Sequence, residues 1–248
     1  MTFAVGFLIA TAVGLTGVGA GSITAPVLIL FFGLPAAEAV GTALAFTAVI
    51  KLAVAPIYLF RGQVSRRVLW RLCAGGVPGV LAGVALISML GTKRYEGVIF
   101  LLVGATVAIT AVYSLLRTIS MHIHIGKEER LAWLPGIAGV IGAEVGFSSA
   151  GAGALGSLAL LNLTALRPAE VVGTDMLFGL VLSLIGGGLH VVQGNYSSDI
   201  LWKLITGGLA GAFVGANLSA ILPSRPLRIA LSVWLSGVGI QLCWRALS

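Results

Sequence analysis

Two short clusters of glycine and hydroxyl residues are the strongest candidates for chemistry in this chain of 248 residues. Glycine lets a ligand approach the backbone closely, and the free N–H groups at a helix start bind anions. We therefore expect a cradle for a small anion, with hydroxyls added by the segments that follow each cluster. The alternative is that the small residues only let helices pack closely. The expected cradle residues are Thr16, Gly19, Gly21, Ser22, Thr42, Ser148, Ser149, Gly151, Gly153 and Thr174.

Charged residues inside apolar stretches form the second group of candidates, because a charge buried in a membrane is expensive and usually functional. Lys51 and Asp175 lie at comparable predicted depth, where Lys51 could pair with Asp175, attract an anion or pass a proton. The structural alternatives are a lysine that extends to the surface and an aspartate that caps a local turn. Glu144 and His190 could form a proton relay.

Metal and cofactor chemistry is not indicated by the sequence. His122 and His124 have no cysteine or acidic cluster around them, so we interpret them as solvated residues of a linker. Cys73 and Cys243 lie in apolar runs and do not suggest a disulfide or a metal site. We expect no cofactor.

The chain is an internal duplication with a fixed offset of 132 residues. Residues 14–90 and 146–222 align without a gap and agree at 25 of 77 positions. Both of the clusters of glycine and hydroxyl residues lie within the repeated part. We predict repeat one over 1–118, a polar linker over 119–130 and repeat two over 131–248.

The amino-acid composition indicates that this protein folds in a lipid bilayer. Hydrophobic residues make up 58% of the chain, charged residues only 9%, and the mean hydropathy is +1.07. Continuous apolar runs without alternation predict an all-α, polytopic membrane protein and exclude a membrane β-barrel. Segments are expected at 2–13, 23–32, 36–60, 69–90 and 95–116, and again at 131–145, 154–163, 168–192, 201–222 and 226–246.

The first element of each half is expected to be broken. Residues 3–33 are too many for one straight crossing of about 30 Å, whereas a re-entrant hairpin with its glycine-rich turn at mid-depth fits. Each half then crosses the membrane three times, so the two repeats would be inverted. Basic residues outside the spans favour that topology, with ten on the cytoplasmic side and four outside. The net charge of +7 is thereby explained by orientation, without a nucleic-acid partner.

The residues at 17–22, 35–42 and 172–175 resemble the sulfite exporter TauE/SafE family of membrane permeases. The resemblance implies a secondary transporter in the bacterial inner membrane that exports sulfite, sulfoacetate or another organosulfonate by alternating access. It also implies that protons could be coupled to transport. The partners would then be the lipid bilayer and a small sulfur-containing anion, and a homodimer is one option for the assembly.

Two other functions stay open at this point. A passive anion channel would differ from a transporter only in mechanism. An intramembrane serine hydrolase would need Ser148 or Ser149 to be activated by His190. The matched position of Ser148 in repeat one is Thr16, which favours a role in the scaffold.

Overall fold

The computed structural model describes residues 2–16, 19–90, 96–120, 130–151, 153–218 and 224–247, and these residues form ten α-helices and no strand. The first half contains α1 (Thr2–Thr16), α2 (Ala20–Phe32), α3 (Ala36–Phe60), α4 (Arg66–Leu90) and α5 (Glu96–Ser120). The second half contains α6 (Leu134–Ser148), α7 (Ala154–Leu163), α8 (Pro168–Val192), α9 (Ser198–Leu218) and α10 (Ser224–Leu247). The predicted all-α class is confirmed, and α3, α7 and α8 have the predicted bounds.

Within the described residues, four helices are long and apolar enough to cross a membrane, namely α3, α4, α8 and residues 97–116 of α5. Helices α9 and α10 have 21 and 24 residues, which at 1.5 Å per residue also reach about 30 Å. Large apolar side chains such as Phe60 and Phe213 are exposed on the outer surface. This arrangement is that of a multi-pass membrane protein, in which lipid covers an apolar exterior.

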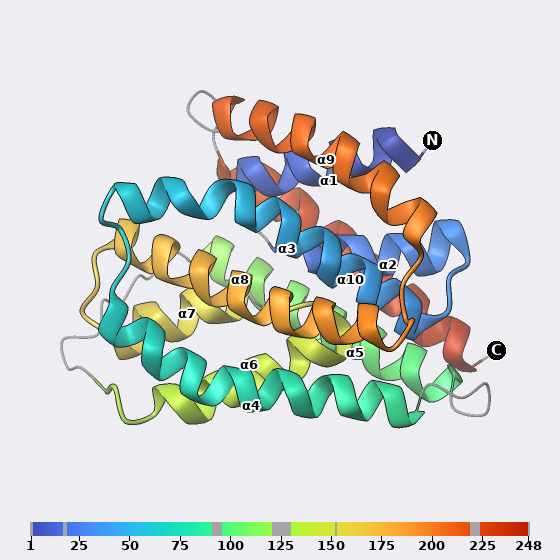
Figure 1. Cartoon of the computed structure of the whole chain (residues 1–248), viewed down its shortest axis with the longest axis horizontal. Coiled ribbons are helices and arrows are strands. Elements are labelled where there is room, and N and C mark those ends of the chain that lie inside the picture. Colours follow the sequence, from blue (N-terminus) through green and yellow to red (C-terminus); the bar gives the residue numbers. More distant parts are fainter. Residues whose placement is uncertain are drawn as a thin grey trace.

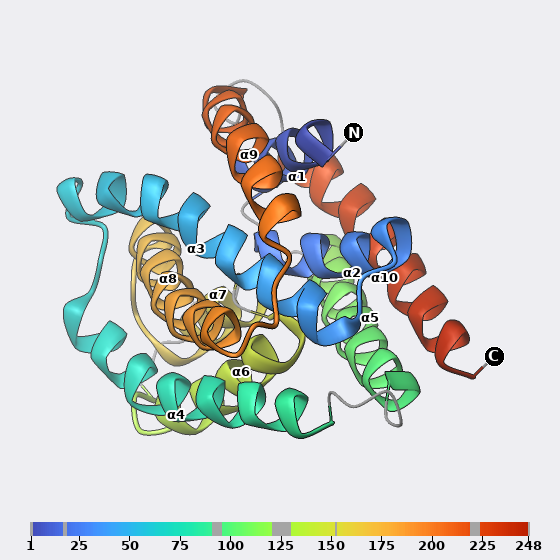
Figure 2. The same cartoon turned by 45° about the vertical axis from the view of Figure 1, so that its right-hand side comes forward.

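The first element of each half consists of two short helices. Helices α1, α2, α6 and α7 have 15, 13, 15 and 10 residues, so each is only about 15–23 Å long. Figures 1 and 2 show that α2 returns in the direction from which α1 came, and that α7 does the same after α6. The glycine-rich turns therefore lie at the tips of two helical hairpins.

The two halves exchange their hairpins. Helix α1 packs along α9, and the equivalent helix α6 packs along α4. The contacts repeat with the offset of 132 residues, because a Cβ at Gly75 would lie 1.8 Å from the Pro135 carbonyl oxygen and one at Gly207 would lie 2.1 Å from that of Phe3. Glycine is required at both positions for backbones to approach so closely.

Helices α3 and α8 form the centre of the molecule and run antiparallel. Gly41 near the start of α3 contacts His190 near the end of α8, and Gly187 contacts Ala45. The other equivalent pair, α5 and α10, is also antiparallel, since Cys243 approaches Leu101. Equivalent helices of opposite direction are what inverted repeats require, but the side of the membrane that each end faces stays a prediction.

The predicted linker over 119–130 lies almost entirely outside the described residues, together with His122 and His124. Helix α5 ends at Ser120 and α6 begins at Leu134, so the helices of the two repeats lie on either side of this stretch. The division into 1–118 and 131–248 remains a proposal.

Candidate functional site

The two hairpin tips meet each other inside the molecule. The hydroxyl of Ser149 donates a hydrogen bond of 3.0 Å to the carbonyl oxygen of Gly21, at the start of α2. Ser149 ends α6 in a left-handed conformation with φ of 60°, which turns the chain sharply into the second tip. The tips of the two repeats thus form one joint structure.

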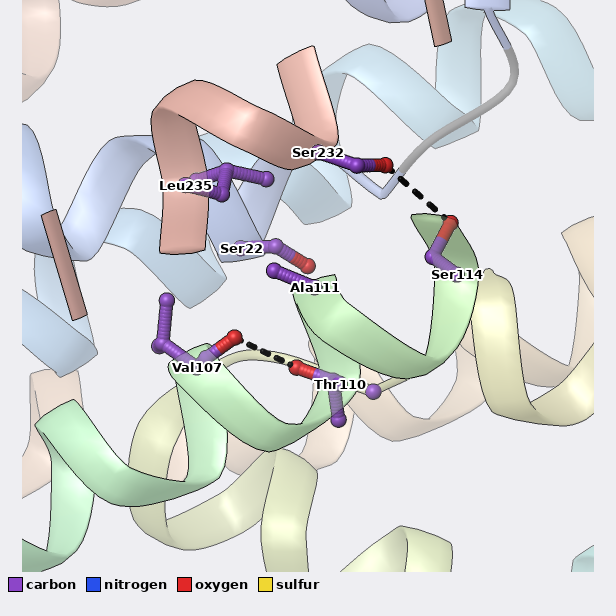
Figure 3. Close-up of a pocket in the computed structure, with 8 residues that line it drawn as sticks. Ser22, Val107, Thr110, Ala111, Ser114, Ser232 and Leu235 are labelled. Carbon is purple, nitrogen blue, oxygen red and sulfur yellow. Dashed lines mark hydrogen bonds between the residues drawn. The ribbon is translucent and has the colours of Figure 1, made fainter. Parts of the chain in front are cut away.

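A small cavity lies beside this contact, between the tips and helices α5 and α10 (Figure 3). It offers about 20 Å³ to water-sized molecules, which is room for a single water. Hydroxyl groups of Ser22, Thr110, Ser114 and Ser232 contribute its polar surface. The lining consists of Ser22, Val107, Thr110, Ala111, Ser114, Gly151, Ser232 and Leu235.

Hydroxyls on α5 and α10 form hydrogen bonds around the cavity. Ser232 donates across to Ser114 with 3.4 Å between the oxygens, so this pair links α10 to α5. Thr110 donates to the carbonyl oxygens of Thr106 and Val107 within its own helix, at 2.8 and 3.0 Å. Each hydroxyl can still accept a hydrogen bond, and each can rotate to donate to an anion instead.

Most of the predicted cradle residues lie at the tips, but only Ser22 and Gly151 line the cavity. The hydroxyl of Ser148 donates to the Glu144 carbonyl oxygen at 3.0 Å and accepts from the Ala150 N–H at 3.2 Å, so it stabilises the turn. Gly19 precedes α2 as its N-cap, and Gly153 holds the same place before α7. The side chain of Thr16 is outside the described residues.

Thr42 and Thr174 are placed elsewhere in the structure. The N–H of Ser197 donates to the Thr42 hydroxyl at 2.9 Å, and the N–H of Ser65 donates to that of Thr174 at 3.0 Å. Each threonine therefore holds the loop of the opposite half, and neither lines the cavity. These two residues serve the assembly of the halves, and the structure does not bring them to the cradle.

Asp175 belongs to α8, and its side chain lies against the first turn of α7 and not in the cavity. Its Oδ2 atom accepts a hydrogen bond of 2.7 Å from the Ser157 hydroxyl, and its Oδ1 atom lies against Gly156. Lys51 interacts with Asp175 electrostatically, yet the two residues form no ion pair within 4.0 Å in the described part of the chain. Both side chains are buried, with exposures of 7% for Lys51 and 5% for Asp175.

Nearly the whole chain matches a known family of membrane proteins. The family model of the sulfite exporter TauE/SafE matches residues 2–242. The chain belongs to this family. The match to TauE/SafE covers both hairpins and reaches all ten helices of the described structure, so the resemblance seen at 17–22, 35–42 and 172–175 is confirmed over nearly the whole chain.

Two relatives of this TauE/SafE protein come from Bacillus subtilis (strain 168). The chain is 24% identical over 248 residues to "Probable membrane transporter protein YjnA", with 96% of each chain covered. It is 27% identical over 243 residues to "Probable membrane transporter protein YdhB", with 95% of this chain and 96% of the relative covered. No solved structure matches. Both names describe probable membrane transporters.

Glu144 is a partly buried acid next to the TauE/SafE tips that the predicted cradle did not include. A Cβ at Gly151 would lie 2.7 Å from Glu144 Oε2, so the carboxyl group faces the backbone that lines the cavity. Its Oε1 atom is buried and has no hydrogen-bond partner among the described residues.

His190 is not placed to activate a serine. Its Nε2 atom lies 3.4 Å from the carbonyl oxygen of Gly146, while Ser148 and Ser149 both donate to backbone carbonyls. The described residues therefore contain no serine–histidine pair of the kind that a serine hydrolase uses.

Thr110, Ser114 and Ser232 were missed by sequence reasoning. Thr110 and Ser114 are four residues apart and so share one face of α5, which is a signal that the sequence does contain. Comparison of the two repeats does not point to these hydroxyls, because the residues 132 positions away are Leu242, Ala246 and Phe100. Only the antiparallel packing of α5 on α10 shows that these hydroxyls converge.

Proposed function

We propose that the protein is a secondary transporter that exports a small sulfur-containing anion, such as sulfite, sulfoacetate or another organosulfonate, by alternating access. The observation that carries this proposal is the cavity at the start of α2, where the two tips meet. The N-terminus of a helix presents free N–H groups and the positive end of its dipole, and both favour an anion. Ser22 in the first turn of α2 lines that cavity.

The chemistry of the lining supports a small oxyanion. Four hydroxyl side chains face the cavity, and hydroxyls can donate to the oxygens of a sulfite or sulfonate group. The described lining residues include no lysine or arginine, so the helix terminus would compensate the charge of the anion. A weak, distributed site of this kind suits a transporter, because the anion must also leave.

The size of the cavity supports movement. Room for one water is too little for an anion with three oxygen atoms, so the cavity would have to widen before such an anion could bind. The Ser114–Ser232 hydrogen bond joins the helices that cover the cavity, and it would have to break as α5 and α10 separate. Alternating access in duplicated transporters proceeds by such movement of one repeat against the other.

Proton coupling would follow from Glu144. A carboxylate beside a bound anion repels it, so the anion would bind best when Glu144 carries a proton. The buried Oε1 atom, which has no partner among the described residues, is consistent with an acid that is neutral for part of the cycle. Binding of anion and proton together would give proton-linked transport.

The test is transport by the purified protein in liposomes. Labelled sulfite should exchange across the membrane, and sulfoacetate, thiosulfate and sulfate should compete according to their fit. An imposed pH gradient should drive accumulation above the external concentration. Exchange without any accumulation would instead indicate a passive anion channel, and absence of anion flux would contradict the proposal.

A further inference from the structure

The N-terminus of α7 is closed by a carboxylate from the protein itself. Asp175 on α8 reaches the first turn of α7, where Ser157 faces it with both its hydroxyl and its backbone N–H. The side chain is 95% buried, being 5% exposed, and its Oδ1 atom has no hydrogen-bond partner in the described part of the chain. A buried carboxyl group thus sits where a helix of ten residues presents its positive end, a setting that favours its charged form.

The carboxylate fits beside α7 because Gly156 has no side chain. A Cβ at that position would lie 2.0 Å from Asp175 Oδ1, so any other residue would push the carboxylate away from the helix terminus. Lys51 adds a positive charge in the neighbourhood without forming a direct ion pair among the described residues. Helix terminus, hydroxyl, glycine and lysine together make the elements of a small-anion site.

The equivalent site in the first half has no carboxylate of its own. The offset of 132 residues places Ala43 where Asp175 stands, and Thr24 and Ala25 where Gly156 and Ser157 stand. The start of α2 therefore keeps its positive end uncompensated by any acid at the equivalent position. The two halves differ at all three positions, and only the second half carries an acid there.

We propose that Asp175 occupies an anion site at the start of α7 as a permanent substitute for a ligand, so that an external anion binds only at the tip of α2. The inference rests on the proposed function for the role of that first tip. The part that does not rest on it is that the pocket of Asp175 is an anion site. This pocket should bind a small carboxylate once the Asp175 side chain is removed. One anion would then move in each transport cycle.

The experiment removes the Asp175 carboxylate by substitution and then supplies a free carboxylate in solution. Asp175→Ala in the full chain, purified in detergent, leaves space beside Gly156, and sodium formate supplies a carboxylate of matching size. Thermal unfolding is followed at increasing concentrations of formate, of neutral formamide and of sodium gluconate, whose anion is too large for the space. A ligand that binds only the folded state raises the unfolding temperature in a saturable way.

The expected result is a lowered unfolding temperature for Asp175→Ala that formate raises again, while formamide and gluconate do not. The wild type and Asp175→Asn should not respond in this way, because their side chains fill the same space. Should Asp175→Ala not be extracted, Asp175→Ser leaves similar room and carries the same measurement. An equal response of wild type and variant to formate, or an equal effect of formate and formamide, would overturn the inference.

This measurement does not depend on transport. If formate restores Asp175→Ala but no sulfur anion is transported, the built-in anion stands and the proposed function fails. If transport is found but formate has no specific effect, the proposed function stands and the role given to Asp175 fails.

Discussion

A side chain on Gly21 would collide with Ser149, because a Cβ at Gly21 would lie 2.0 Å from the Ser149 carbonyl oxygen, although the two residues are 128 positions apart. We expect Gly21→Val to push the tips apart and to abolish anion binding, at a cost of about 1–3 kcal/mol in stability. Binding and thermal unfolding of the purified variant test this.

The matched control for that substitution is Gly188→Val. Gly188 is a helical glycine in α8, and no atom lies within 4 Å of the place that a Cβ would take there, so its replacement should change stability by no more than about 1 kcal/mol. Unchanged affinity in Gly21→Val would show that the joint between the tips does not shape the site.

Thr110→Val removes a hydroxyl from the cavity while preserving the shape of the side chain. Loss of one hydrogen bond of about 1 kcal/mol should weaken anion binding roughly fivefold. Thr206→Val is the control, since Thr206 likewise donates to two carbonyls of its own helix but is exposed on α9. Equal effects of the two substitutions on affinity would argue against a role for the α5 hydroxyls.

Glu144→Gln should separate anion exchange from proton coupling. The amide has the shape of the protonated acid and cannot release a proton, so exchange of labelled anion should persist. Accumulation driven by an imposed pH gradient should be lost. A variant that still accumulates anion as the wild type does would exclude Glu144 as the coupling group.

Lys51 and Asp175 should be coupled in stability. Lys51→Met leaves Asp175 without its neighbouring positive charge, and Asp175→Asn leaves Lys51 buried without compensation. The double variant should therefore be less destabilised than the sum of the single variants, with a coupling of about 0.5–3 kcal/mol. Strict additivity in thermal or denaturant unfolding would mean that the two charges act independently.

The inverted topology predicts opposite accessibility for equivalent loops. Single cysteines at Arg66 and Ser198, in a chain whose Cys73 and Cys243 are replaced by alanine, should react differently with an impermeant maleimide in intact cells. We expect labelling at position 198 and protection at 66, following the distribution of basic residues. Equal protection at both positions would indicate parallel repeats.

The bounds of α3 and α8 were predictable because local signals set them. Pro35 and Pro168 stand at the starts of α3 and α8, and Gly62 and Gly194, with φ of 64° and 74°, follow their ends. These signals act within a few residues and need no knowledge of the tertiary fold. The tips were predictable for the same reason, since glycine clusters mark breaks in apolar helices.

The cavity was less predictable because it depends on packing between halves. Thr42 and Thr174 were predicted as hydroxyls from the segments that follow the two clusters, but position along the chain does not decide what a hydroxyl contacts, and both accept hydrogen bonds from loops. Ser114 and Ser232 break the symmetry and converge only through the antiparallel packing of α5 on α10. A single sequence contains no direct signal for such a contact.

The exchanged hairpins have a consequence for how the protein is made. The hydroxyl of Thr11 in α1 donates a hydrogen bond of 3.1 Å to the Gly211 carbonyl oxygen in α9, 200 positions later in the chain. At a synthesis rate of about 5–20 residues per second, α1 leaves the ribosome about 10–40 s before its partner. During that interval a helix too short to span the bilayer has no protein surface to cover its turn. Biogenesis must therefore hold the first hairpin at the insertion machinery or at the membrane surface until the second half has entered, and a nascent chain that stops after α5 would be a substrate for quality control.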